Sequence, residues 1–311
     1  MSRLFIIGNG FDIAHRIPSS YDDFRKFLID KINGLSAIEY SYDYDFRKSI
    51  EIYDKLAKCS KTYPYGSSET YLEKYLGESD MIKAVLLYIS ITEKNAFWSK
   101  IEESIGNYDF KEIKKYCIIT TNEGISLHNE DIIKPYTLIA KQIPKMFSCW
   151  VNSLDSLLAS NNIRYGFFES QLNSHDTIFL NFNYTDTLER FYGVNRKNIC
   201  YVHGKTGSTE LLFGHSSSLH PVERLEGFLG MGEGMFSILH ALEKPVERQI
   251  RFLSKFLSKF SMIDEVYSFG FSYGISDISY VRKIVDFTTA KSVTGKLFSL
   301  LTGKLNSLLF H

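Results

Sequence analysis

The sequence predicts an α/β protein: one parallel-sheet domain that carries a large helical insertion. Short apolar runs that end in turn residues alternate with segments of helical periodicity, which is the pattern of strands and crossover helices. A long block with helical periodicity, about 21–160, separates the first apolar run from the others. We therefore expect a single α/β domain over 1–287, with the block inserted after its first strand, and a distinct tail at 288–311.

The first strand is expected at Arg3–Ile7, an apolar run that is bounded by Gly8 and Gly10. The helical block that follows has apolar residues at helical spacing in two places. These are Phe24, Phe27, Leu28 and Ile32, and then Met81, Val85, Tyr88 and Ile89. A further apolar run at Tyr116–Thr120 fits either a strand or the buried end of a helix.

Strands and helices alternate after about residue 177, as a parallel sheet requires. The expected strands are Thr177–Phe182, Ile199–Val202, Glu210–Phe213 and Glu265–Phe269. Between them we expect a helix through Leu188 and Phe191 and an amphipathic helix at Glu247–Phe260. The inward face of that second helix consists of Ile250, Leu253, Leu257 and Phe260. A helix at Asp277–Phe287 closes the domain.

The tail, Thr288–His311, differs in composition from the rest of the chain. It contains no acidic residue, and TGKLFSLL at 294–301 nearly repeats as TGKLNSLL at 302–309. Its lysines and leucines could form a helix that binds a membrane surface or a partner. The other interpretation, which we favour, is a frayed or non-native terminus.

Charge and composition exclude several classes of protein. Lysine plus arginine and aspartate plus glutamate both number 36, and a net charge of zero argues against a broad binding surface for DNA or RNA. No apolar run reaches the roughly 18 residues of a membrane-spanning helix. Asn9, Asp12 and His15 interrupt the N-terminus before the apolar region of a signal peptide could be completed. We expect a cytoplasmic protein.

The spacing of the cysteines and histidines does not predict a metal site. Cys59, Cys117, Cys149 and Cys200 form no C-x-x-C pair, and the chain has no H-E-x-x-H motif. We therefore expect neither a zinc ribbon nor a disulfide framework, and no metal cofactor.

The first candidate binding motif is the G-N-G turn at residues 8–10, between a strand and a helix. Such a turn presents backbone N–H groups and the positive end of a helix dipole to an anion. The alternative is a tight turn without a ligand, because the pattern G-x-G-x-x-G would require glycine at Ile13. Asp12 could cap the helix, and His15 on a helix face could be a structural histidine.

Polar side chains stand at the ends of two later strands. Asn181 and Asn183 lie on the edge where open α/β sheets bind ligands, and an amide there could hold a ribose hydroxyl or orient a water molecule. His203 ends the next strand, directly before Gly204, and an imidazole fixed at this point is well placed as a general base. In each case a turn, helix-cap or structural role is the alternative.

A fourth motif follows the last expected strand of the domain. Gly270, Ser272 and Asp277 lie in a turn and at the beginning of a helix, which could form a second backbone nest for an anion or a ribose. The stretch also reads G-x-S-x-G, the nucleophile-elbow pattern of α/β hydrolases. Only His311 follows Ser272, however, and we set the hydrolase interpretation aside.

Together these motifs resemble the AbiH family of bacterial abortive-infection proteins. Members begin with a strand, a G-N-G-F-D turn, a histidine and a Y-x-x-F step, which here are Gly8–Asp12, His15 and Tyr21–Phe24. Four further segments resemble the family: W-S-K-I-E at 98–102, F-N-Y-T-D-T-L-E at 182–189, V-H-G at 202–204 and G-F-S…D at 270–277. The segment after Phe287 does not resemble the family, which implies an atypical or truncated C-terminus.

AbiH sequences are in turn similar to the sirtuin type of NAD-binding fold, a Rossmann-like parallel sheet. This resemblance implies that Asn183 and His203 are the catalytic residues. It also implies a cofactor-binding set, which consists of Gly8, Asn9, Gly10, Phe11, Asp12, His15, Asn181, Gly270, Ser272 and Asp277. The zinc-ribbon cysteines of sirtuins are missing and Thr185 stands where related NADases have aspartate, so a protein deacylase is not expected.

The resemblance implies that the protein binds NAD+ and cleaves its nicotinamide–ribose bond, which would deplete NAD during phage infection. The turn at 8–10 would approach the pyrophosphate with the Asp12 carboxylate pointing away, and the 270–277 segment would hold the adenosine. The implied partners are NAD or a related nucleotide, a second copy of the chain, and a phage-derived trigger. The alternatives are a non-catalytic nucleotide sensor and an interaction toxin that acts on membranes through the 288–311 tail.

Overall fold

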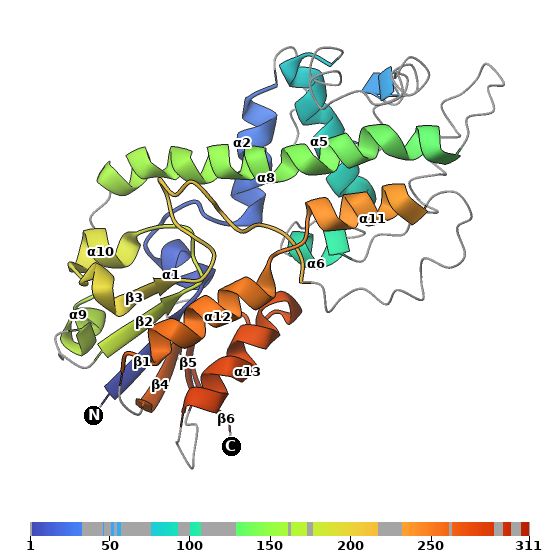
Figure 1. Cartoon of the computed structure of the whole chain (residues 1–311). Coiled ribbons are helices and arrows are strands. Elements are labelled where there is room, and N and C mark those ends of the chain that lie inside the picture. The colour runs from blue at the N-terminus through green and yellow to red at the C-terminus, as the bar shows by residue number, and fades with distance from the viewer. Residues whose placement is uncertain are drawn as a thin grey trace. The chain divides into compact units, whose positions relative to one another are not determined.

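The computed structural model describes residues 2–32, 46, 51–52, 55–56, 76–92, 100–106, 129–160, 163–172, 177–216, 232–260, 263–288, 295–299 and 306–310 (Figure 1). The chain divides into two compact units. Unit 1 consists of Met1–Ser20, Ser148–Leu212 and Pro245–His311, and unit 2 consists of Tyr21–Phe147 and Phe213–Lys244. Each unit is described by itself.

Unit 1 is built on a sheet with the strand order β3-β2-β1-β4-β5-β6. The strands are β1 (Ser2–Ile7), β2 (Thr177–Asn181), β3 (Ile199–Tyr201), β4 (Ile263–Phe269), β5 (Gly295–Ser299) and β6 (Asn306–Phe310). Neighbouring strands from β3 to β5 pair in parallel, and β6 runs antiparallel to β5. The expectation of a Rossmann-like α/β fold with a parallel sheet is confirmed.

The strand order reverses direction at β1. From β1 the chain continues to β2 and β3 on one side, and it then returns to β4, which pairs with the other side of β1. In open α/β sheets, ligands bind outside the carboxyl ends of the strands at such a reversal. The loops that follow β1 and β4 therefore lie at the position where sheets of this kind bind ligands.

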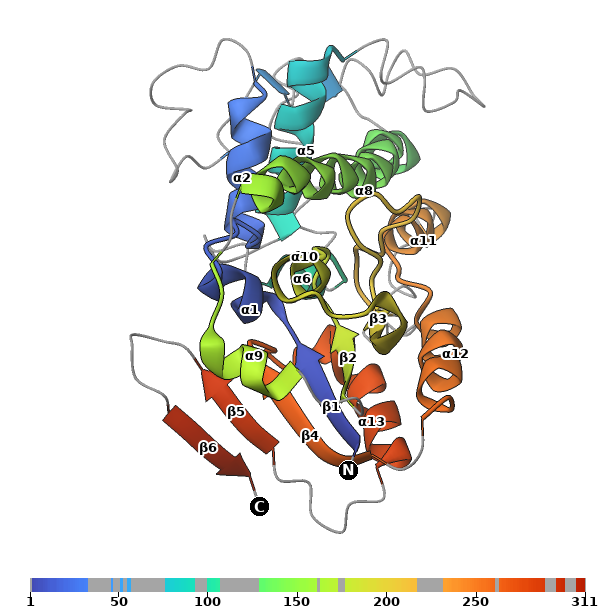
Figure 2. The same ribbon diagram turned by 90° about the vertical axis from the view of Figure 1, so that its left-hand side faces the viewer.

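Helices cover both faces of this sheet (Figure 2). Alternate side chains of β1 point to opposite faces, so Leu4 and Ile6 join one apolar core and Phe5 and Ile7 join the other. The helices on the first core are α12 (Val246–Leu257) and α13 (Ile278–Phe287), and those on the second are α1 (Asn9–Ala14), α9 (Gly166–Leu172) and α10 (Thr187–Tyr192). Two-sided burial explains why the consecutive residues 4–7 of β1 and 178–180 of β2 are all apolar.

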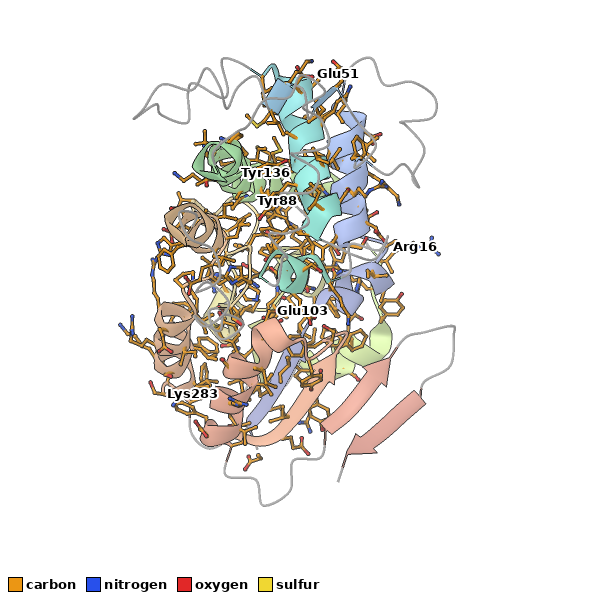
Figure 3. The ribbon with its side chains drawn as sticks, turned by 90° about the vertical axis from the view of Figure 1, so that its right-hand side faces the viewer. Arg16, Glu51, Tyr88, Glu103, Tyr136 and Lys283 are labelled. Atoms are coloured by element: carbon orange, nitrogen blue, oxygen red, sulfur yellow. The ribbon has the colours of Figure 1, made fainter. Side chains whose placement is uncertain are left out.

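Unit 2 is helical in the part that the structure describes. Its helices are α2 (Tyr21–Asp30), α5 (Glu78–Thr92), α6 (Ile101–Gly106), α11 (Gly232–Ala241) and most of α8 (Asn129–Ser160), which continues into unit 1. The rings of Tyr88 on α5 and Tyr136 on α8 lie 6.3 Å apart in the unit's core (Figure 3). A buried ion pair joins Lys244 Nζ to Glu102 Oε2 at 2.9 Å. None of the helices described in either unit is both long and apolar enough to cross a membrane.

Most expected elements of unit 1 are confirmed to within a few residues, including β1, β2, β3, β4, α10 and α13. The inward face of α12 is also confirmed, because Leu253 and Leu257 are buried and Ile250 and Phe260 pack against the same core. The strand expected at Glu210–Phe213 is wrong. This segment makes one backbone hydrogen bond toward the sheet edge, from Leu212 N to His203 O at 2.9 Å, and continues as a loop.

The helix considered for the tail is also wrong, because β5 and β6 occupy its two near-repeats as strands. A helix draws most of its stability from packing of its apolar face, whereas pairing with the edge of β4 gives the backbone groups of β5 partners directly. The apolar run at Tyr116–Thr120 lies outside the described residues.

Candidate functional site

The loops after β1, β2, β3 and β4 meet at one edge of the sheet, because these strands are parallel. Direct contacts join them in pairs. The loop after β2 donates a hydrogen bond to the loop after β1, from Asn183 Nδ2 to Gly8 O at 3.0 Å. The loop after β3 contacts the beginning of α13, where His203 Nε2 lies 3.2 Å from Asp277 Oδ1. The structure thus brings together the residues that were expected from four separate motifs.

The glycine turns after β1 and β4 contact each other backbone to backbone. Gly8 N donates to Phe269 O at 3.0 Å and Gly10 N donates to Gly270 O at 2.9 Å. A Cβ atom on Gly8 would lie 2.5 Å from Phe271 Cα, and one on Gly270 would lie 2.4 Å from the Phe11 nitrogen. The glycines are therefore needed for close packing of two turns. The N–H groups of Gly8 and Gly10 are already engaged, so these two glycines do not offer them to a phosphate.

Asp12 lies inside α1 and its side chain is 0% exposed. Its carboxylate accepts hydrogen bonds from Thr185 Oγ1 at 2.5 Å and from Thr187 Oγ1 at 2.8 Å. Burial raises its pKa from 3.8 to about 6, although the hydrogen bonds from the two threonines and from Asn183 lower it. The helix begins after Gly8 as its N-cap, so the interpretation of Asp12 as a cap is wrong. The carboxylate instead anchors the loop that follows β2.

Asn181 and Asn183 shape that same loop. Asn181 Oδ1 accepts a hydrogen bond from Asn183 N at 3.0 Å, and Asn181 Nδ2 donates to Thr185 O at 3.1 Å. Both side chains are buried. Asn181 therefore fixes the path of the chain, and Asn183 bridges this loop to the turn after β1.

His15 is buried beneath α1 and engages both of its ring nitrogens. Nδ1 lies 2.6 Å from Phe11 O, and Nε2 lies 2.6 Å from the Tyr192 hydroxyl. Because a carbonyl oxygen can only accept, Nδ1 carries the proton and Nε2 accepts the hydroxyl proton of Tyr192. Burial lowers the pKa of His15, which also favours the neutral ring. Phe11 lies in the apolar core, so both residues hold α1 against α10 in this structure.

His203 and Asp277 form the most distinctive pair at the sheet edge. The imidazole is 3% exposed, and the rings of Phe182, Tyr184 and Tyr280 lie 5.6, 6.0 and 5.7 Å from it. Since the carboxylate of Asp277 is the acceptor, Nε2 carries a proton, and in the neutral ring the lone pair then resides on Nδ1. An imidazole with a fixed tautomer and a carboxylate partner can accept a proton and then be stabilised as the imidazolium.

Charged side chains beside β3 compensate one another. Lys205 Nζ lies 2.8 Å from Glu189 Oε1 and 3.8 Å from Asp186 Oδ2. Arg190 pairs with Asp186 at 2.6 Å and also with Asp155. The positive charge of Lys205, two residues beyond His203, is thus already balanced by neighbouring carboxylates.

The remaining candidates lie at the surface of these loops. Ser272 is exposed, and Asn9 is exposed with its Oδ1 accepting a hydrogen bond from Ser19 Oγ at 2.6 Å. Within the described part of the chain, no group of three or more His, Cys, Asp or Glu side chains could hold a metal ion.

Sequence reasoning missed several residues of this site. Thr185 and Thr187 hold Asp12, while Tyr184 and Tyr280 pack on His203. The two threonines are separated by one residue and closely follow β2, and this spacing is the sequence signal that could have revealed them. The contact of Tyr280 with a ring 77 positions away depends on the packing of α13 and has no local signal.

One comparison decides the family. A family model described as bacteriophage abortive infection AbiH matches residues 4–298. The chain belongs to the AbiH family. The match covers all four loops of the site and reaches β5, so the expected departure from AbiH after Phe287 is wrong up to residue 298. Membership places this AbiH chain among bacteriophage abortive-infection proteins. No curated protein and no solved structure matches it.

Proposed function

We propose that this AbiH protein binds NAD+ and cleaves the nicotinamide–ribose bond, lowering the cytoplasmic NAD pool of an infected cell. The observation that carries the proposal is the pair of a buried His203 and a partly buried Asp277 at the carboxyl edge of a parallel sheet. Open α/β sheets bind nucleotides at this edge. The choice of NAD+ as the ligand rests on the similarity of the motifs to those of sirtuin-like NADases.

The proposed reaction requires little acid catalysis, since nicotinamide leaves as a neutral molecule. The bond between its ring nitrogen and C1′ of the ribose breaks through an oxocarbenium-like state, and water adds to C1′. The water loses its proton to Nδ1 of His203, and Asp277 stabilises the resulting imidazolium. The products are nicotinamide, ADP-ribose and a proton. A positioned general base of this kind contributes about 10²- to 10⁴-fold to a rate.

The surroundings of His203 support this chemistry. Phe182 and Tyr184, the residues on either side of Asn183, both place their rings against the imidazole. Asn183, between them, donates its amide to Gly8 O, so in this structure it holds the loop that carries the two rings against His203. Such a site excludes bulk water and strengthens electrostatic interactions within it.

The proposal assigns Asp277 and the glycine turns different roles from those expected. Asp277 orients His203 instead of holding the adenosine, because its carboxylate lies against the imidazole. The turn at 8–10 supports the site by packing on Gly270, and the Asp12 carboxylate points to Thr185 and Thr187. That orientation keeps an anionic side chain away from a bound pyrophosphate.

A non-catalytic nucleotide sensor is the second candidate. The observation that favours it is the low exposure of His203, which limits access of substrate and water to the ring. A sensor would bind NAD+ and relay a signal, without release of nicotinamide.

The decisive experiment measures nicotinamide release from NAD+ by the purified protein, with and without an extract of phage-infected cells as a source of the trigger. We expect His203→Ala and Asp277→Asn to lower release about 100-fold or more. His240→Ala is the matched control, since this histidine on α11 has a 75% exposed side chain. NAD+ binding without release under either condition favours the sensor, and absence of both binding and release contradicts the proposal.

A further inference from the structure

The loop between β4 and α13 holds an aromatic residue in an unfavourable backbone conformation. Tyr273 has φ +54°, and Arg16 is the other non-glycine residue of the described chain with positive φ. The left-handed region disfavours side chains with a Cβ atom, and such residues persist where surrounding structure or function requires them. Tyr273 is 38% exposed, so burial of its ring does not account for the conformation.

The ring of Tyr273 forms the outer end of a row of aromatic contacts. It packs edge-on against Phe271 at 4.9 Å, Phe271 packs against Phe182 at 4.5 Å, and Phe182 lies 5.6 Å from His203. Phe271 and Phe182 are buried, whereas Tyr273 is exposed. The row therefore begins at the buried imidazole and ends at an accessible aromatic ring on the same loop cluster.

We propose that Tyr273 is a ligand-binding residue whose ring stacks on a planar heteroaromatic group of the bound nucleotide. The inference rests on the proposed nucleotide site around His203. A base or nicotinamide ring can stack on an exposed tyrosine. In nucleic-acid sites, stacking of a base on an aromatic side chain is strong and depends little on which base it is. The positive φ of Tyr273 holds the ring at the loop surface, ready for such a contact.

The test separates the ring from the strain of the backbone. Tyr273→Gly relieves the strain and removes the ring, Tyr273→Asn keeps a side chain that tolerates positive φ, and Tyr273→Phe keeps the ring. Arg16→Gly is the matched control, because it relieves the same kind of strain at a side chain that points away from the ribbon (Figure 3). The probes are AMP and nicotinamide mononucleotide, whose binding is measured by calorimetry.

We expect Arg16→Gly to raise the melting temperature by about 2 °C. Tyr273→Gly should change it little, because the loss of the ring contact with Phe271 offsets the relief of strain. Tyr273→Gly and Tyr273→Asn should weaken binding of one of the two probes about tenfold. Tyr273→Phe and Arg16→Gly should bind both probes within about twofold of the wild type. The probe that is weakened identifies the stacked group as adenine or nicotinamide.

Unchanged binding of both probes by Tyr273→Gly would overturn the inference and leave the proposed reaction intact. Ring-dependent binding by a protein that releases no nicotinamide would support the inference and refute the reaction. A wild-type protein that binds neither probe would overturn the inference together with the proposed nucleotide ligand.

Discussion

Asp12→Asn provides a direct test of the buried carboxylate beneath the site. In the folded protein the pKa of Asp12 is about 6, compared with 3.8 for the exposed group, and burial is the main cause. The folded state therefore binds this proton more tightly than the unfolded chain does. Stability from this group is greatest below pH 3.8 and falls as the pH rises through about 6.

The size of the effect follows from the difference between the two pKa values. A shift from 3.8 to about 6 corresponds to roughly 3 kcal/mol of unfolding free energy in total, of which about 2 kcal/mol is lost between pH 4.5 and 7. Asparagine has nearly the same shape, does not ionise, and can still exchange hydrogen bonds with Thr185 and Thr187. The variant should lack this loss, so that its stability relative to the wild type increases by about 2 kcal/mol over that interval.

Urea unfolding followed by circular dichroism at pH 4.5 to 7 measures this difference. Asp286→Asn on α13 is the matched control, because the Asp286 side chain is 68% exposed and the chemical change is the same. Its stability profile should run parallel to that of the wild type. A parallel profile for Asp12→Asn as well would refute the assignment of a buried, costly carboxylate at position 12.

Two further substitutions test the packing of each unit. In thermal unfolding, Gly270→Ala should destabilise unit 1 by roughly 4 kcal/mol or more, because φ is +65° and the new Cβ would meet Phe11 N at 2.4 Å. Gly207→Ala is its control: φ is +76° there but the Cβ would enter open space, so the cost should be only about 1 kcal/mol. In unit 2, Lys244→Met should cost about 3–5 kcal/mol in urea unfolding, since it leaves the Glu102 carboxylate without its partner. Adding Glu102→Gln should restore most of that loss, and equal stabilities of the single and double variants would contradict the importance of the pair.

Much of unit 1 could be predicted from the sequence because its signals are local. Apolar runs that end in turn residues define β1, β2, β3 and β4, and parallel strands necessarily deliver their following loops to one edge. Asn183 and His203 are therefore brought to that edge by rules that need no tertiary contacts. Glu210–Phe213 failed because four apolar or mixed residues are too short a pattern to distinguish a strand from a loop.

The contacts that define the site could not be predicted in the same way. Asp277 pairs with a histidine 74 positions earlier, and Asp12 with threonines more than 170 positions later. These partners depend on how α13 and α10 dock on the sheet, which local periodicity does not encode. The need for glycine at position 270 could not be predicted for the same reason, since it arises from contact with the backbone of the turn after β1.

The position of β1 in the middle of the sheet has a consequence for biosynthesis. It is the first strand to be made, yet Ser2 N bonds to Asp264, 262 positions later in the chain. At 5–20 residues per second, the ribosome needs roughly 13–50 s to supply β4 after β1 has emerged. The apolar strand lacks both neighbours until β2 has been made and one of them until β4 has been made, so its protection in the cell depends on the rate of translation and on chaperones.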